Sequence, residues 1–343
     1  MLLWTLLVAF VVGCLAVDLG VLNPNPHVVR TREALRWTGL WIGVALAFSA
    51  FVYFGYAGGW LGLGTEVGFP KTGGEAWSQY ITGYLVELSL SMDNVFVIAL
   101  IFGFFGIEAR HQHRILYWGI LGAVVFRGVM IAVGAALLER FEWVTYVFGA
   151  VLLLSAYKMW RSGGGEVDPD RNPVVRAFKR FYPVSDEHHD ERFFTVENGR
   201  RVATPALVAL IVIETTDIVF AFDSIPAIFA ITRDPFIVFS SNVFAILGLR
   251  SLYFVLASMM DRFHLLKYAL VFVLAFVAVK ILLVHFVHIP ALVSLGVIVV
   301  VLGGGIVLSL RNPRVPPAAG APPQRDSAAP AVRAARAVAA EEV

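Results

Sequence analysis

The sequence predicts an all-α, polytopic membrane protein with about nine transmembrane helices, and three observations support this fold class. Apolar side chains make up 58% of the 343 residues, charged side chains make up only 15%, and the mean hydropathy is +0.76. The apolar residues fall in runs of about 18 to 25, which suits helices that cross a bilayer. Most basic residues lie in alternate loops between these runs, as expected for a multi-pass protein.

The apolar runs predict nine helices, which together form a transmembrane domain over residues 1–310. No lysine or arginine precedes Arg30, so the first run lacks the charged start of a signal peptide and is expected to remain as a helix. The predicted ranges are 2–22, 38–57, 79–105, 115–137, 143–160, 205–231, 237–258, 266–288 and 291–310.

Two segments are expected to lie outside this bundle. Residues 161–204 form a loop, and the stretch FFTVENGRRVATP within it predicts a short β-hairpin that turns at Asn198 and Gly199. Residues 311–343 are mostly Ala, Pro and Arg with little to bury, so they are expected to form a disordered tail.

The distribution of charge predicts the orientation in the membrane. One side holds 20 of the 27 basic residues, in the loops at 30–36, 110–114, 161–204 and 262–267 and in the tail. The positive-inside rule places this side and the C-terminus in the cytoplasm, and the N-terminus on the opposite side of the membrane. The formal net charge of +2 gives no indication of a nucleic-acid partner, and no feature of the sequence identifies a protein partner.

The apolar runs contain a repeat of charged positions. In ELSLSMDN, Asp93 follows Glu87 by six residues, and in DIVFAFDS, Asp223 follows Asp217 by six residues. The next two runs of each copy carry an arginine and then a lysine, namely Arg127 and Lys158 in the first copy and Arg250 and Lys280 in the second. Because a unit of three helices enters the membrane from opposite sides in consecutive copies, helices 3–5 and 6–8 are predicted to be inverted repeats, as in secondary transporters.

The acidic residues inside these runs predict a site for a cation. Each one costs about 2.5 to 3.5 kcal/mol at the bilayer centre, so a functional reason for them is expected. The candidate ligands supply only carboxylate, amide and hydroxyl oxygens, which favour Mn²⁺, Mg²⁺ or Ca²⁺ over Zn²⁺ or copper. They are Glu87, Asp93, Asn94, Glu214, Asp217, Asp223 and Ser224.

A second set of charges is expected to support the site. These residues are Arg127, Arg250, Lys158, Lys280 and Asp18. The membrane would then hold six acids against four bases, an excess that one divalent cation or two protons would neutralise. We therefore expect a divalent cation and protons to be transported substrates, and we expect no resident cofactor.

On unbroken helices the acids of each run point in different directions, because residues six apart differ by about 240°. Bringing them to one point requires either local unwinding or two helices that face each other across a shared cavity. Pro226 favours a break, since it cannot donate to the carbonyl of Phe222. The sequence therefore predicts a discontinuous helix beside Asp223.

Other interpretations of the charged residues remain open. Asp93 with Arg127, and Asp223 with Arg250, could be structural ion pairs that fix the bundle. The stretch DEHHDE at 186–191 could bind a second metal, but a solvated charged turn is the preferred interpretation. An intramembrane aspartyl protease is not expected because its GxGD sequence is absent, so the protein is predicted not to be an enzyme.

Four stretches resemble the TerC family of bacterial integral membrane proteins, in the branch that includes Alx. They are ELSLSMDN at 87–94, NPVVRAFKRFYPVS at 172–185, IETTDIVFAFDSIPAIFAIT at 213–232 and DPFIVFSSNVFAILGLRSLYF at 234–254. The resemblance spans residues from about 30 to 310. It implies a relationship to the LysE-like transporter group and a historical association with tellurite resistance.

The same resemblance implies that the protein exports manganese from the cytoplasm. The family's metal-site acids fall on Glu87, Asp93, Glu214, Asp217 and Asp223, with Asn94 beside them. The expected mechanism is alternating access with exchange of a divalent cation for protons. Calcium remains an alternative substrate, and a membrane scaffold in a tellurite-stress complex, docking through loop 161–204, remains an alternative function.

Overall fold

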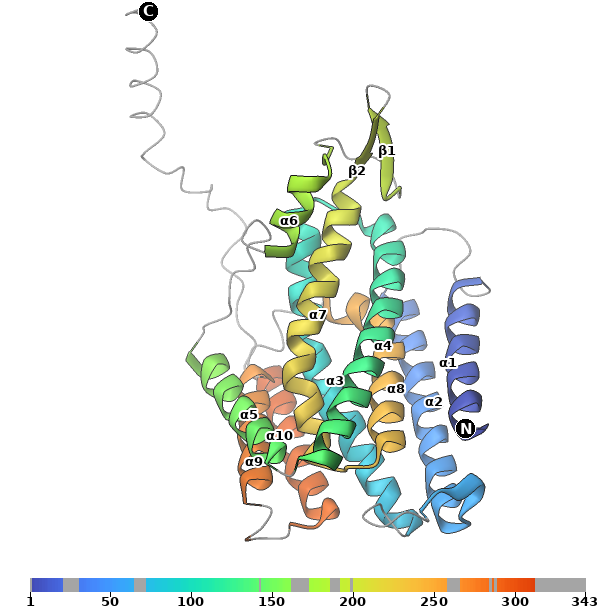
Figure 1. The fold of residues 1–343 in the computed structure, drawn as a ribbon, viewed down its shortest axis with the longest axis vertical. Helices are drawn as coiled ribbons and strands as arrows, with labels where there is room; N and C mark the ends of the chain where they lie inside the picture. Colours follow the sequence, from blue (N-terminus) through green and yellow to red (C-terminus); the bar gives the residue numbers. More distant parts are fainter. Residues whose placement is uncertain are drawn as a thin grey trace, which may run out of the picture.

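The computed structural model describes residues 2–20, 31–64, 72–141, 143–161, 173–185, 192–197, 200–257, 266–283, 286 and 289–311 (Figure 1). In these residues the fold is a helical bundle with a small two-stranded sheet. The helices are α1 (Leu2–Gly20), α2 (Thr31–Ala57), α3 (Gly73–Phe104), α4 (Ala109–Arg140), α5 (Val144–Arg161), α6 (Pro173–Phe181), α7 (Pro205–Phe229), α8 (Pro235–Ala257), α9 (Leu266–Leu282) and α10 (Ala291–Arg311). A 3-10 turn, η1, covers Trp60–Gly62, and the strands are β1 (Phe194–Glu197) and β2 (Arg200–Ala203).

The protein is an all-helical, polytopic membrane protein. Within the described residues, five helices are long and apolar enough to cross a membrane, namely α2, α4, α7, α8 and α10. The apolar parts of α1 and α9 are shorter. Large apolar side chains such as Val219 and Phe222 on α7 are about 60% exposed, as expected for a surface that faces lipid.

Helix α8 lies at the centre of the bundle. Its apolar segment is 94% buried, whereas the segments of the other four long helices are only 22–33% buried. The first turn of α8 is fixed by Asp234, whose carboxylate accepts hydrogen bonds from the Phe236 amide at 2.9 Å and from the Tyr56 hydroxyl at 2.5 Å. Asp234 therefore caps α8 and also ties it to the end of α2.

The contacts between helices α3–α5 and helices α7–α9 form matching pairs. Helix α3 packs against α8, α4 packs against α7, and α5 packs against α9. Two further contacts join α3 with α7 and α4 with α8, and in both pairs the helices run in opposite directions (Figure 1). Helices α3 and α7 therefore face each other, which places the two acidic stretches on neighbouring elements.

Helix α7 is continuous from Pro205 to Phe229, so the predicted break at Pro226 is wrong. The reason lies in the position of this proline near the end of the helix. Its missing N–H removes one hydrogen bond, to the carbonyl of Phe222, and the chain leaves the helix at Ala230, within about one turn. The acids of α7 consequently keep helical spacing and point in different directions.

The predicted hairpin is confirmed in residues 194–203, where β1 and β2 pair antiparallel and Glu197 lies opposite Arg200. The region 161–204 also contains α6, which was not predicted. Val175 and Phe178 of α6 pack against the bundle, whereas Val174, Arg176, Ala177 and Arg180 are exposed. The turn at 198–199, the stretch 186–191 and the predicted tail from 312 onward lie outside the described residues.

Candidate cation site

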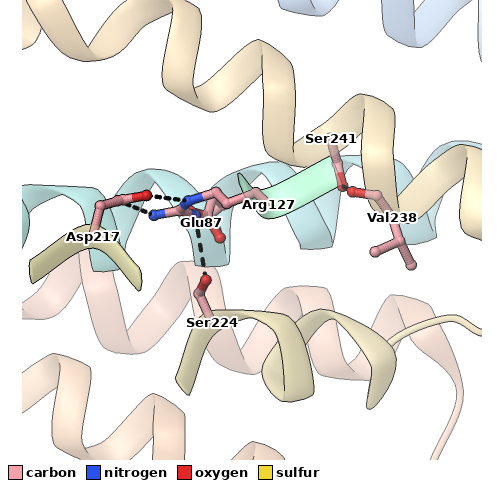
Figure 2. A network of polar contacts seen from close by, with 6 residues as sticks. All are labelled: Glu87, Arg127, Asp217, Ser224, Val238 and Ser241. Atoms are coloured by element: carbon pink, nitrogen blue, oxygen red, sulfur yellow. Dashed lines mark hydrogen bonds and ion pairs between the residues drawn. The ribbon is translucent and has the colours of Figure 1, made fainter. Parts of the chain in front are cut away.

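Arg127 is the centre of a buried polar network inside the bundle (Figure 2). It comes from the middle of α4 and is only 2% exposed. Its guanidinium forms ion pairs with Glu87 of α3, which is fully buried, and with Asp217 of α7. The network therefore joins both acidic helices through one basic side chain.

The two carboxylates contact Arg127 in different ways. Asp217 uses both oxygens, accepting from Nη2 at 2.7 Å and from Nε at 3.1 Å, in the two-point geometry that Arg favours. Glu87 accepts only through Oε1, and its Oε2 is buried with no hydrogen-bond partner among the described residues. One oxygen of Glu87 is therefore open to another donor or to a cation.

Ser224 completes the ring of acceptors, because Arg127 Nη1 also donates to its hydroxyl oxygen at 3.3 Å. Ser224 lies seven residues after Asp217 on α7, which places both on the same face of the helix. This face points toward α3 and α4, as Figure 2 shows. The continuous helix thus delivers two of the predicted ligands to one point without unwinding.

A small cavity of about 30 Å³ lies beside Asp217. Its polar lining comes from Asn94 of α3 and from Thr216 and Asp217 of α7, and apolar side chains complete it. This volume has room for one water-sized group. Asn94 and Asp217, both predicted as ligands, therefore meet at a common space.

Glu214 lies one turn before Asp217 and packs against α4. A Cβ added at Gly122 would overlap the Glu214 carboxylate, so only glycine leaves room for this acid between α4 and α7. The Oε2 atom of Glu214 is buried without a hydrogen-bond partner in the part of the chain that the structure describes. Glu214 is thus a second acid with an open oxygen.

Asp223 points away from this network, toward α5. It accepts a hydrogen bond of 2.5 Å from the hydroxyl of Ser155 on α5, and the Lys158 side chain interacts with it electrostatically. Asp223 therefore does not form the ion pair with Arg250 that the sequence left open. Arg250 itself is 5% exposed on α8.

Side-chain positions are described for only some of the remaining predicted residues. Asp93 lies in α3 and Asp18 in α1, but their side chains are outside the described part of the structure. Arg127 was considered as a partner of Asp93, and its contacts described above are instead with Glu87, Asp217 and Ser224. Lys280, at the end of α9, donates a 2.9 Å hydrogen bond to the hydroxyl of Ser294 on α10.

Lys280 lines a second, larger cavity of about 580 Å³ at the end of the bundle where α3 and α10 begin and α7 ends. Gln79 of α3 also lines it, and its Oε1 atom has no hydrogen-bond partner among the described residues. Gln79 lies eight residues before Glu87, about 12 Å along the same helix. Between them, Gly83 lets Ser241 of α8 come close, since a Cβ there would lie 2.9 Å from the Ser241 hydroxyl.

The described side chains do not form a preassembled metal cluster. No group of three or more His, Cys, Asp or Glu residues among them lies close enough to hold a metal ion. The structure brings Glu87, Asp217 and Ser224 together around Arg127, with Asn94 next to Asp217. Glu214 interacts electrostatically with Asp217 but is not a partner of Arg127, and Asp223 is bonded to α5 instead. The site is therefore held by an internal ion-pair network in this arrangement.

Sequence reasoning missed three residues that shape the site. Ser155 was not recognised as the partner of Asp223, Gly122 was not recognised as the space for Glu214, and Gln79 was not linked to Glu87. A lone serine or glycine in an apolar run carries no signal of its own. For Gln79, its spacing of two helical turns from Glu87 was the available signal.

These features define the class: a multi-pass helical membrane protein with a charged, buried centre between its helices. The chain belongs to the integral membrane protein TerC family, whose sequence profile matches residues 72–316.

Three relatives support this assignment. The "Uncharacterized membrane protein STKORF319" of Myxococcus xanthus is 47% identical over 315 residues, which cover 92% of this chain and 94% of the relative. Proteins of Escherichia coli (strain K12) and Salmonella typhi, each named "Putative membrane-bound redox modulator Alx", are 42% identical over 298 residues, covering 87% of this chain and 90% of theirs. No solved structure matches the chain.

Proposed function

We propose that this protein is a secondary transporter that exports a divalent metal cation from the cytoplasm in exchange for protons. Manganese is the proposed substrate, because the oxygen donors suit a hard divalent cation and the TerC-like sequence stretches imply manganese export. Calcium is the competing substrate. The observation that carries the proposal is the pair of a fully buried Glu87 and a partly buried Asp217, held by α3 and α7 in the interior of a membrane bundle.

The architecture supports transport by alternating access. We propose nine membrane-spanning helices, in which α3–α5 and α7–α9 are inverted repeats. The reciprocal contacts of α3 with α8 and of α4 with α7 are the pattern that such a symmetry requires. The ion site would lie where the first helices of the two repeats face each other.

The proposed orientation places the N-terminus outside and the C-terminus in the cytoplasm of a bacterial plasma membrane. The hairpin and α6 lie at the end of the bundle where α7 begins, so this end is cytoplasmic (Figure 1). The 580 Å³ cavity lies at the opposite end and would face the outside. We propose that it is the exit vestibule, with Gln79 between it and Glu87.

Charge balance supports exchange with protons. A divalent cation bound to Glu87 and Asp217 compensates the negative charge of both carboxylates, and returning protons compensate this charge when the cation leaves. Exchange of the cation for protons therefore avoids an uncompensated carboxylate inside the membrane.

The Alx relatives are named as redox modulators, so the cysteine content of this chain is relevant to its function. This chain contains one cysteine, Cys14, a half-buried residue of α1. One thiol cannot form a disulfide within the chain, so we assign the function to cation movement and not to thiol exchange.

The test is uptake of Mn²⁺ into proteoliposomes whose interior is more acidic than the bath and whose protein has its cytoplasmic face outward. Wild-type protein is expected to take up Mn²⁺ in proportion to the pH gradient, with Ca²⁺ and Mg²⁺ present as competitors to rank the ions. Glu87→Gln and Asp217→Asn are expected to reduce uptake by about tenfold or more.

The matched control is Glu139→Gln, which removes an exposed carboxylate from the last turn of α4. It is expected to leave uptake unchanged. Gradient-independent uptake, or equal uptake by wild type and both site variants, would contradict the proposal. No uptake of any ion by folded wild-type protein would favour the scaffold function.

A further inference from the structure

The position of Arg127 points to a role in the step that returns the transporter without its cargo. Its guanidinium lies between the two carboxylates that the proposed function gives to the cation. A cation at Glu87 and Asp217 would compete with Arg127 for the same oxygens. In this structure Arg127 pairs with both of these carboxylates.

The geometry around Arg127 differs from that of a fully paired structural salt bridge. Such a bridge inside a low-dielectric interior is expected to use both oxygens of each carboxylate, because every unpaired oxygen is costly. Asp217 meets this expectation and Glu87 does not, since Glu87 Oε2 has no hydrogen-bond partner among the described residues. Glu87 is therefore only half satisfied by Arg127.

The surroundings also provide Arg127 with a neutral acceptor. Ser224 accepts from Nη1 at 3.3 Å on the side of the guanidinium away from Asp217 (Figure 2). The 30 Å³ cavity lies on the Asn94 side of Asp217 and could receive a water-sized ion. A cation entering there would meet Asp217 first and would then weaken its pairing with Arg127.

We propose that Arg127 is a tethered counter-cation, which together with a returning proton neutralises Glu87 and Asp217 whenever the site holds no metal ion and so permits the transporter to reorient without its cargo. This inference rests on the proposed function and assigns Arg127 to one step of the transport cycle, the return without metal. Without a positive charge at this position, a single returning proton would leave one bare carboxylate to reorient inside the membrane, which is strongly unfavourable. The loaded transporter carries its own cation and does not need Arg127 for that step.

The role predicts that loss of Arg127 separates two kinds of flux. Exchange of Mn²⁺ inside for labelled Mn²⁺ outside uses only the loaded transporter. Net uptake driven by a pH gradient also requires the step without metal. Arg127→Gln is therefore expected to reduce net uptake by about tenfold or more and to leave the exchange rate within about twofold of wild type.

The experiment compares both fluxes in the same proteoliposomes, preloaded with unlabelled Mn²⁺ for exchange and metal-free for net uptake. Arg140→Gln is the matched control, because it removes an exposed arginine from the same helix. It is expected to change neither flux. Equal net uptake by Arg127→Gln and wild type, or equal loss of both fluxes in folded Arg127→Gln protein, would overturn the proposal.

A second variant guards against misfolding of Arg127→Gln. Arg127→Lys keeps the charge but cannot contact both oxygens of Asp217, so it is expected to slow net uptake more than exchange. Equal slowing of both would overturn the counter-cation role. Wild-type protein that shows neither flux would instead refute the proposed transport function, and the inference would fall with it.

Discussion

At the scale of single residues, the two acids bound to Arg127 differ in how completely they are satisfied. Asp217 is held at two points, whereas the fully buried Glu87 is held at one, and its second oxygen has no hydrogen-bond partner within the described part of the chain. A buried oxygen without a hydrogen-bond partner lowers the stability of the folded protein, so the position of Glu87 Oε2 has an energetic cost. This is the pattern expected of a binding residue and not of a purely structural one.

Removing Arg127 is expected to destabilise the protein more than removing the charge of Glu87. Arg127→Ala leaves two buried carboxylates without their cation, which costs about 3–5 kcal/mol when a buried pair is broken. Glu87→Gln leaves Arg127 paired with Asp217 and should cost clearly less. Thermal unfolding of the purified variants in detergent measures the difference, and equal losses would show that Glu87 contributes as much as the whole network.

Gly122 is expected to be required for the position of Glu214. In Gly122→Ala the new methyl group overlaps the carboxylate, which can move because it ends a flexible side chain. We expect normal folding but reduced Mn²⁺ uptake, measured in the gradient assay. Gly103→Ala is the control, since a Cβ there meets nothing within 4 Å. Uptake by Gly122→Ala equal to that of this control would remove Glu214 from the site.

The sequence was sufficient to select the charged residues but not to pair them. Arg127 was recognised as a supporting charge, yet which acids it contacts depends on how α3, α4 and α7 are rotated against one another. Hydrophobic patterning constrains that rotation only loosely, because these helices are apolar on nearly all sides. For the same reason Ser155 was not recognised as the partner of Asp223.

At the scale of secondary-structure elements, continuous helices present the site residues on different faces. Asp217 and Ser224 share one face of α7 and meet Arg127, while Asp223 lies on another face and meets α5. The helix assignments followed from the apolar runs, and each of the nine has a counterpart among the described helices. Their ends were less accurate, since α3 begins at Gly73, six residues before the predicted start.

Two element predictions failed for local reasons. The proline rule applies to the interior of a helix, and Pro226 is too close to the C-terminal end of α7 to interrupt it. Helix α6 was missed because its sequence, PVVRAFKRF, is short and basic and resembles a loop. Its proline at the first helical position and its apolar residues three apart were the available signals.

The contact between α5 and α9 depends on Gly149. A Cβ at this position would lie 2.7 Å from the side chains of Ile281 and Leu282, so Gly149→Ala must separate the two helices or displace these side chains. We expect a loss of about 1–3 kcal/mol, visible as a lower unfolding temperature. Gly296→Ala on α10, where a Cβ meets nothing within 4 Å, is the control. Equal unfolding temperatures for the two variants would contradict the packing described here.

At the scale of the whole molecule, the two ends of the helical bundle differ in structure and chemistry. One end carries α6 and the hairpin, and the other carries the 580 Å³ cavity (Figure 1). Composition and run length were enough to predict a polytopic helical membrane protein. The cavity was not predictable, because it is formed by side chains from helix ends that are distant in sequence.

The orientation can be tested with thiol labelling, since Cys14 is the single cysteine of the chain. In a Cys14→Ser background, Trp60→Cys in η1 should react with a membrane-impermeant maleimide on intact cells, and Arg200→Cys in β2 should not. Both positions are exposed. Inside-out vesicles should give the opposite result. Labelling of position 200 from outside would reverse the proposed orientation.

The central claim is that Glu87 and Asp217 bind the transported cation, and a binding titration tests it most directly. Mn²⁺ would be titrated into purified protein, with free Mn²⁺ followed by electron paramagnetic resonance. The account predicts saturable binding to wild-type protein that is lost in Glu87→Gln and Asp217→Asn and kept in Glu139→Gln. Equal binding by all four proteins, or no saturable binding by folded wild type, would contradict it.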